Sequence, residues 1–113
     1  MCDLKNKEKT QTERAVGLMG LAVRAGKVVF GTPMVCDAMR SGKKLYLVVE
    51  ASDSSENTHK RITDRCAYYG VTHMRIGVGT SALAHALGKS GDLAVAAITD
   101  KGMAEAVVKL LQS

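Results

Sequence analysis

Basic side chains recur in this sequence close to the glycines at which helices and strands are expected to end. Lys27 follows the glycine that ends the first predicted helix, and Arg40 lies near the end of the second. At Gly31-Thr32 a glycine precedes a predicted helix, whose first backbone amides and positive dipole end suit a phosphate group or a base edge. Arg61 and Arg65 lie four residues apart on another predicted helix, where like charges repel unless an anion lies between them. This pattern is typical of a surface that binds a polyanion.

The overall charge agrees with such a partner. The 113-residue chain has 16 Lys and Arg against 11 Asp and Glu, a formal net charge of +5, and its pI is near 9.3. This surplus favours RNA, DNA or an anionic membrane surface, and a solvated basic surface without a partner is the alternative. With three Tyr and one Phe, the chain offers too few aromatic rings for the stacking surfaces that hold single strands. We therefore expect a folded RNA, recognised by its shape.

Two glycine motifs raise the question of an enzyme or a nucleotide-binding protein. Gly88-Lys89-Ser90 ends like a phosphate-binding loop, but that motif needs a glycine where this chain has Leu83. We interpret Gly88 instead as the glycine that follows the end of a helix. Gly77 and Gly79 match a looser dinucleotide-binding pattern, with Asp100 as the acid that would bind the ribose. A small nucleotide-binding protein therefore remains an alternative.

The histidines and cysteines do not predict a catalytic or metal site. His59 and Cys66 lie two helical turns apart, too far to hold one ion, and no other Cys or His pair has the spacing of metal ligands. Since no base accompanies a nucleophile either, we expect no catalytic residue, no metal and no cofactor. The odd cysteine count is a poor disulfide framework, so we expect Cys36 and Cys66 to be buried thiols in a reducing compartment, the cytoplasm. The polar N-terminus and the short apolar runs predict neither a signal peptide nor a membrane span.

These residues are positioned by helices and strands that alternate along the chain. The expected N-caps are Thr10 or Thr12, Thr32, and Thr80 or Ser81. Helices are predicted at residues 10–26, 32–42, 55–70, 80–88 and beyond 99, and strands at 27–30, 45–49, 71–76 and 93–99. The alternation predicts a three-layer α/β/α sandwich with helices on both faces of the sheet. We expect residues 10–113 to form a single domain and residues 1–9 to form a flexible basic tail.

Several stretches resemble a known family of RNA-binding proteins. The opening of the ribosomal L-seven-Ae/thirty-e family is similar to residues 21–31 (LAVRAGKVVFG), and its central strand to residues 44–50 (KLYLVVE). The helix end and following strand of that family resemble Leu83, Ala86, Gly88, Lys89 and residues 94–99. Residues 55–69 (SENTHKRITDRCAYY) resemble, more narrowly, the bacterial YlxQ-type branch of this family, which consists of small stand-alone proteins. The resemblance covers about residues 12–112.

The resemblance implies a fold, a function and a surface. It implies an α/β/α sandwich around a mixed four-stranded sheet, without enzymatic activity, that binds kink-turns or related internal loops of structured RNA such as ribosomal RNA. The protein would be ribosomal or ribosome-associated, and we expect a monomer. Residues 50–53 would line the same edge as the RNA-binding positions, which are Gly26, Lys27, Gly31, Thr32, Pro33, Met34, Gly88, Lys89 and Ser90.

Three positions depart from the pattern of the family's kink-turn binders. Those proteins carry Asn-Glu or another polar pair, and then a Lys, where this chain has Pro33, Met34 and Asp37. Pro and Met cannot make the hydrogen bonds with which Asn and Glu read guanine edges, and Asp37 brings negative charge near the expected phosphate. We therefore expect a more electrostatic mode of binding that uses Lys43, Lys60, Arg61 and Lys89. A protein-interaction module that has lost RNA specificity is the alternative.

Overall fold

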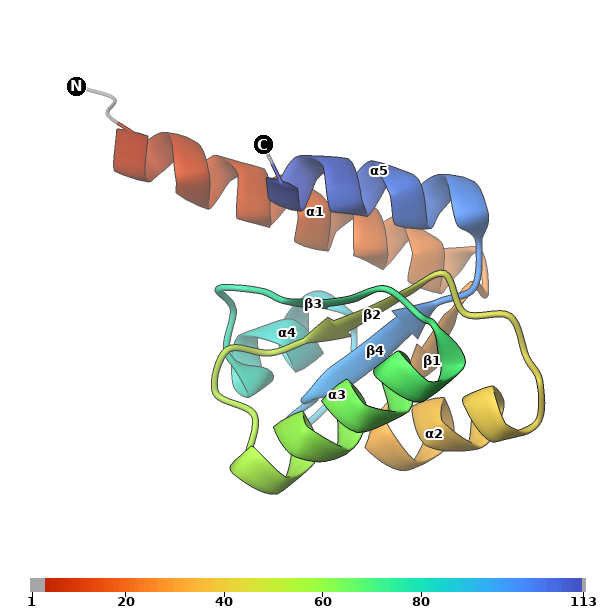
Figure 1. Ribbon diagram of the computed structural model, residues 1–113. Helices are drawn as coiled ribbons and strands as arrows, with labels where there is room; N and C mark the ends of the chain where they lie inside the picture. Colours follow the sequence, from red (N-terminus) through yellow and green to blue (C-terminus); the bar gives the residue numbers. More distant parts are fainter. Residues whose placement is uncertain (1–3, 113) are drawn as a thin grey trace.

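Two layers of helices enclose a central sheet (Figure 1). The computed structural model describes the backbone of residues 4–112 and the side chains of residues 11–112. The elements alternate as predicted, in the order α1 (Leu4–Arg24), β1 (Val28–Phe30), α2 (Thr32–Arg40), β2 (Leu47–Glu50), α3 (Glu56–Tyr69), β3 (His73–Arg75), α4 (Thr80–Ala86), β4 (Val95–Ile98) and α5 (Lys101–Gln112). The helices α1, α4 and α5 cover one face of the sheet, and α2 and α3 cover the other. The predicted α/β/α sandwich is therefore confirmed.

The sheet is mixed, and its last strand lies in its interior. The strand order is β1-β4-β2-β3. β4 pairs antiparallel with both β1 and β2, whereas β3 pairs parallel with β2. Every residue of β2 and β4 is buried, which agrees with the uninterrupted apolar runs that predicted strands covered on both faces.

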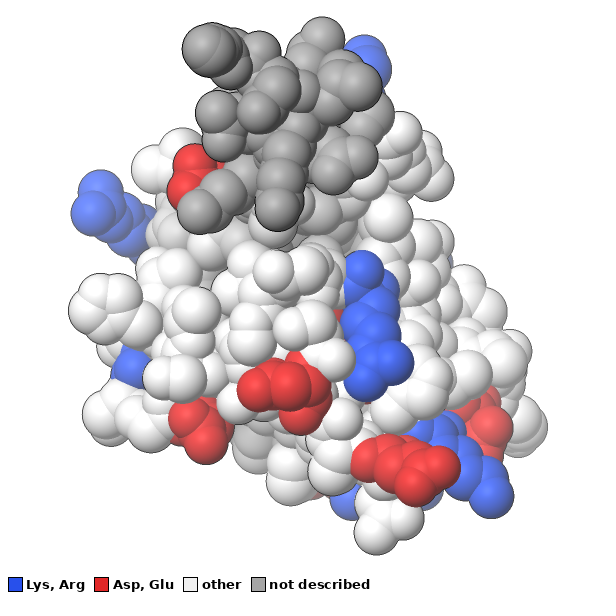
Figure 2. All heavy atoms as spheres, turned by 90° about the vertical axis from the view of Figure 1, so that its left-hand side faces the viewer, with Lys and Arg blue, Asp and Glu red and all other residues white. Residues whose placement is uncertain are grey.

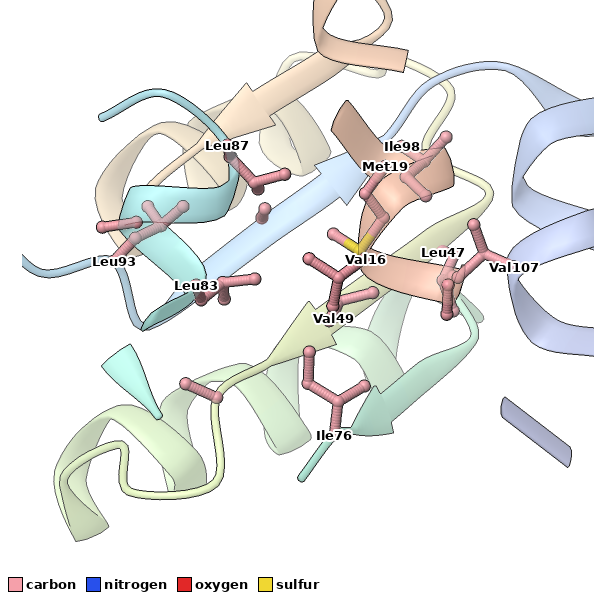
Figure 3. Packing of buried hydrophobic residues seen from close by; sticks show 14 of the residues in the cluster. Val16, Met19, Leu47, Val49, Ile76, Leu83, Leu87, Leu93, Ile98 and Val107 are labelled. Atoms are coloured by element: carbon pink, nitrogen blue, oxygen red, sulfur yellow. The ribbon is translucent and has the colours of Figure 1, made fainter. Parts of the chain in front are cut away.

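Alternate residues of β2 enter two separate hydrophobic clusters, as the twofold period of a strand requires. Leu47 and Val49 pack with Val16 and Met19 of α1 and with Val107 of α5 (Figure 3). On the opposite face, the second cluster joins β2 and β4 to the apolar sides of α2 and α3, and contains Val35, Cys36, Met39, Val48, Ile62, Cys66 and Val95. Cys36 and Cys66 are free, buried thiols, as expected; Cys2 lies outside the described residues.

The helix α1 begins earlier than predicted. Its first residue is Leu4, so residues 4–9 are helical backbone and not part of a loose tail. Leu, Lys and Glu, which make up most of this segment, are good helix formers, and this propensity outweighs the absence of an apolar stripe. The predicted tail is therefore wrong for residues 4–9, and residues 1–3 lie outside the described part.

Two helix starts also differ from the prediction, by one residue each. Gly31, and not Thr32, is the N-cap of α2, because the Gly31 carbonyl already accepts the first helical hydrogen bond, from the Val35 N–H at 2.9 Å. Gly79 takes the same place before α4. By contrast, Ser55 caps α3 with its side chain, which accepts a hydrogen bond from the Thr58 N–H. Among the described residues, no helix combines the length and the apolar character that crossing a bilayer would need.

Candidate nucleic-acid interface

Four loops meet at one edge of the sheet, where β1 and β2 end and β4 begins. We call residues 31–34, 51–55, 77–80 and 88–94 the loop edge. Backbone hydrogen bonds join these loops: the N–H of Gly31 donates to the Val95 carbonyl at 2.9 Å, and the N–H of Ala51 donates to the Ala94 carbonyl at 2.8 Å. Two further bonds, from Ser52 to Val78 and from Leu93 to Thr80, measure 2.9 and 3.0 Å. The loop edge is therefore one connected surface.

The start of α2 lies on this surface beside a lysine from another loop. Gly31 has φ 87° and ψ 150°, and no side chain caps the helix that it begins. Pro33 and Met34 are exposed, Met34 to 59%. The Nζ atom of Lys89 lies 4.1 Å from the centroid of the Phe30 ring, which is a cation–π contact. The structure thus brings Lys89 next to Phe30, directly before the uncapped start of α2.

The loop that carries Lys89 follows α4 through a glycine. Gly88 has φ 79°, and the Lys89 N–H donates to the Ala84 carbonyl at 2.8 Å. This is the geometry of a glycine that terminates a helix, and it confirms the interpretation of Gly88-Lys89-Ser90 as a helix end. Ser90, like Gly88 and Lys89, is exposed.

The negative charge of Asp37 opposes a bound anion less than the position of Asp37 in the sequence indicates. Its carboxylate forms an ion pair with Arg40, three residues further along α2. Both side chains are exposed, so the pair contributes little to stability. It does, however, offset the negative charge that Asp37 would place near a bound phosphate.

The loop edge is not a continuous basic patch. Figure 2, turned so that the side of Figure 1 with α4, the end of β2 and the start of α3 faces the viewer, shows separate basic groups with acidic groups between them. Asp53 and Asp92 belong to the loops themselves and are exposed. Recognition through charge alone would therefore be weak on this face, and shape and backbone donors gain in importance.

The other predicted RNA-binding residues are not all on the loop edge. The Lys27 carbonyl accepts a hydrogen bond from the Thr99 N–H at 2.8 Å, beyond the end of β4. Because β1 runs from Lys27 toward Gly31, the strand separates the two by roughly 13 Å. Gly26 adjoins Lys27, and Lys43 follows α2 near the start of β2, so these residues lie at the opposite end of the sheet. Lys27 and Lys89 therefore lie at opposite ends of β1, and not on the same edge as the sequence predicted.

Lys60 and Arg61 occupy a third position. They are exposed residues of α3, one turn beyond the helix start at Glu56. They therefore flank the loop edge, since α3 begins directly after residues 51–55.

The residues of the nucleotide-binding alternative are far apart. Gly79 lies on the loop edge, whereas Asp100 follows β4 at the opposite end and accepts a hydrogen bond from the Met103 N–H. The Asp53 carboxylate already accepts the Thr80 N–H at 2.7 Å, so an acid occupies the helix start at which a phosphate would bind. The glycine pattern does not form a dinucleotide site in this fold.

A buried polar cluster below the loop edge was not predicted. The side chain of Glu50, at the end of β2, is 0% exposed and contacts His59 of α3 and His73 of β3. Its Oε1 atom lies 2.9 Å from His59 Nδ1 and 2.8 Å from His73 Nε2. Ser54 donates a hydrogen bond to Oε2, and Arg75 Nε lies 3.9 Å from the same oxygen. Burial raises the pKa of Glu50, but the hydrogen bonds from Ser54, His59 and His73 outweigh it, so the pKa lies below its usual value and the carboxylate is charged.

Comparison with known proteins assigns the fold to a family. The family described as "Ribosomal protein L7Ae/L30e/S12e/Gadd45 family" matches residues 14–108, and the chain belongs to it. It lies in the YlxQ-like branch. The chain is 40% identical over 95 residues to "RNA-binding protein YlxQ" of Bacillus subtilis (strain 168), with 83% of this chain and 91% of the relative covered. It is 32% identical over 100 residues to the protein of the same name from Enterococcus faecium, with 88% and 93% covered.

Solved structures agree with this assignment. A protein of unknown function from Bacillus halodurans C superimposes with a TM-score of 0.80 at 28% identity, covering 88% of this chain and 97% of the other. The structure described as "Giardia lamblia 15.5kD RNA binding protein" has a TM-score of 0.74 at 19% identity, with 91% and 86% covered. This second likeness supports the fold alone. The names of the two curated relatives describe RNA-binding proteins and not enzymes.

Proposed function

We propose that this protein binds structured RNA at the loop edge, as a non-enzymatic component of a ribonucleoprotein in the bacterial cytoplasm. The observation that carries the proposal is the contact between Lys89 and Phe30, which holds a cation beside the uncapped start of α2. A phosphate at this position would meet both a positive side chain and the positive end of a helix dipole. The names of the two YlxQ relatives support RNA as the source of that phosphate.

The expected RNA is a bent or internally looped duplex, such as a kink-turn-like element of ribosomal RNA. The loop edge is a connected surface with few aromatic side chains, which suits a fixed RNA shape better than an unstacked strand. Pro33 and Met34 offer no side-chain hydrogen bonds to base edges. Recognition therefore depends on RNA geometry and phosphate contacts, with Lys60 and Arg61 flanking the contact surface on α3. We expect residues 10–113 to act as one domain and the free protein to be monomeric.

Two lysine variants test the location of this surface. Lys89→Ala removes the cation at the loop edge, and Lys27→Ala removes an exposed lysine at the opposite end of β1. Fluorescence anisotropy would measure the affinity of each variant for a kinked hairpin, a straight duplex and a single strand at several salt concentrations. We expect Lys89→Ala to bind the hairpin more weakly and to reduce the salt slope by about one, with Lys27→Ala close to the parent protein.

Three results would contradict the proposal. If Lys89→Ala binds as tightly as the parent at every salt concentration, RNA does not contact this surface. If Lys27→Ala is weakened as much as Lys89→Ala, the contact surface is not the loop edge. A parent protein that binds none of the three RNAs, but retains a protein partner after nuclease treatment, would support the interaction-module alternative instead.

A further inference from the structure

Three side chains of the buried polar cluster bring metal-binding atoms together. Nδ1 of His59, Nε2 of His73 and a carboxylate oxygen of Glu50 all lie within 4.8 Å of one another. They come from α3, β3 and β2, so the fold and not a local sequence motif assembles them. We propose that Glu50, His59 and His73 bind a divalent transition metal ion, with Zn²⁺ the best fit.

The kind of donor atom supports a transition metal. Two imidazole nitrogens and one carboxylate oxygen form a ligand set that suits Zn²⁺ and related ions, whereas Mg²⁺ and Ca²⁺ prefer oxygen donors alone. The Glu50 side chain has no exposed surface. Bound as a carboxylate beside two imidazoles, it would set one negative charge against the two positive charges of the ion. Binding would thus place a counter-charge next to a buried anion.

The oxygen–nitrogen distances require only small side-chain movements, and the two ring nitrogens lie within 4.8 Å of each other. Ligands of a tetrahedral zinc ion lie roughly 3.3 Å from one another, given bonds of about 2.0–2.1 Å. The oxygen–nitrogen separations of 2.9 and 2.8 Å would have to open by about half an ångström. The proton on each ligating nitrogen would have to move to the other nitrogen of its ring, because a ring nitrogen that binds a metal carries no proton. The two rings are tilted by 46° with centroids 6.1 Å apart, so they are not stacked and both approach the same carboxylate edge.

The surroundings of the cluster provide support on one side and access on the other. Ser54 donates to Glu50 Oε2 and holds the carboxylate in place, as outer residues do at metal sites. The side chain of His59 is 40% exposed and that of His73 is 15% exposed, so solvent reaches the cluster from the side of His59. Arg75 is the one described cation that opposes a metal here, and its 44% exposure allows it to turn away into solvent.

The third histidine of the chain provides a matched control. His85 is an exposed residue of α4 and is not part of the cluster. Equilibrium dialysis of the full chain, first stripped with a chelator, would measure the binding of Zn²⁺ to the parent and to His59→Ala, His73→Ala and His85→Ala. We expect one ion per chain in the parent, at least tenfold weaker binding in His59→Ala and His73→Ala, and unchanged binding in His85→Ala.

A second measurement identifies the donor atoms. Titration with Co²⁺ would give visible absorption bands typical of four- or five-coordinate cobalt with nitrogen and oxygen ligands. A strong near-ultraviolet band from sulfur to cobalt would instead assign the ion to a cysteine and overturn the proposal. Circular dichroism would verify that each variant is folded, and if His73→Ala is not, His59→Gln provides the test because its side chain is partly exposed.

The proposal is also overturned if the parent binds no Zn²⁺, or if His59→Ala and His73→Ala bind as the parent does. None of these results depends on RNA binding, so the metal site and the proposed function fail or stand separately.

Discussion

Replacing Glu50 with alanine should destabilise the protein by about 3–4 kcal/mol in metal-free buffer at pH 7. The Glu50 side chain is wholly buried, and it is the shared acceptor for Ser54, His59 and His73. Its removal therefore leaves several polar groups without their acceptor, and two of these groups, on Ser54 and His73, are largely shielded from water.

The magnitude follows from what each partner loses. Ser54 and His73 are the more deeply buried partners, and each polar group left unpaired costs about 1–1.5 kcal/mol. His59 can turn toward solvent and adds little, because 40% of its side chain is exposed. Removal of two buried methylene-sized groups adds about 1 kcal/mol or slightly more. Glu50→Gln keeps the shape and one carbonyl acceptor, so about 1–2 kcal/mol is expected for it.

Urea denaturation followed by far-ultraviolet circular dichroism would measure these free energies of unfolding, with a chelator present throughout. Glu105→Ala, which removes an exposed acid of α5, is the matched control and should change stability by no more than about 0.5 kcal/mol. A loss below about 1 kcal/mol for Glu50→Ala would mean that water replaces the missing carboxylate. A larger loss for Glu50→Gln than for Glu50→Ala would refute the assignment of the hydrogen bonds.

Three further predictions concern other parts of the fold. Burial, with the nearby Cys36 and Glu50, raises the pKa of the Cys66 thiol from 9.0 to about 11, so about 2–3 kcal/mol of stability should be lost as the pH rises from about 9 to about 11. Cys66→Ala should lack that part of the decrease in urea titrations, and parallel pH profiles for the two proteins would contradict it. Asp53→Ala should lower stability by about 1 kcal/mol, because Asp53 accepts the Thr80 N–H at the start of α4; an unchanged melting temperature would show that water caps the helix equally well. Gly31→Ala should cost about 1–3 kcal/mol, since φ 87° with ψ 150° is a backbone region that glycine alone adopts readily, and calorimetry showing no loss would mean that the turn relaxes.

Local patterns in the sequence were sufficient for most of the fold. The apolar runs at residues 45–49 and 93–99 indicated strands buried on both faces, and they contain all of β4 and all of β2 except Glu50. Helix ends could also be predicted from glycines that take a positive φ, as Gly70 does after α3. The start of α1 was missed because the sequence of residues 4–9 has helix propensity but no apolar stripe, and the prediction relied on apolar periodicity.

The candidate site was less predictable because it depends on strand direction and register. Lys27 and Gly31 are close in sequence, yet a strand lies between them, so they occupy opposite ends of the sheet. Glu50 and His73 are 23 residues apart and meet because β2 and β3 pair in parallel, with Val48 opposite His73. No local spacing encodes that register. The available signal was Glu50, an acid at the end of an apolar strand. It indicated that a polar partner exists, but not which residue that partner is.

The position of β4 determines when the protein can complete its fold. β1 lies at the sheet margin with β4 as its neighbour, and β4 also joins β1 to β2. During synthesis β1 therefore cannot pair with its neighbour in the sheet until residues 95–98 have been made. A fragment that stops before Val95 would lack the interior strand β4, and neither hydrophobic cluster could pack completely. Assembly of the sheet is thus a nearly all-or-none event dominated by contacts between distant parts of the sequence.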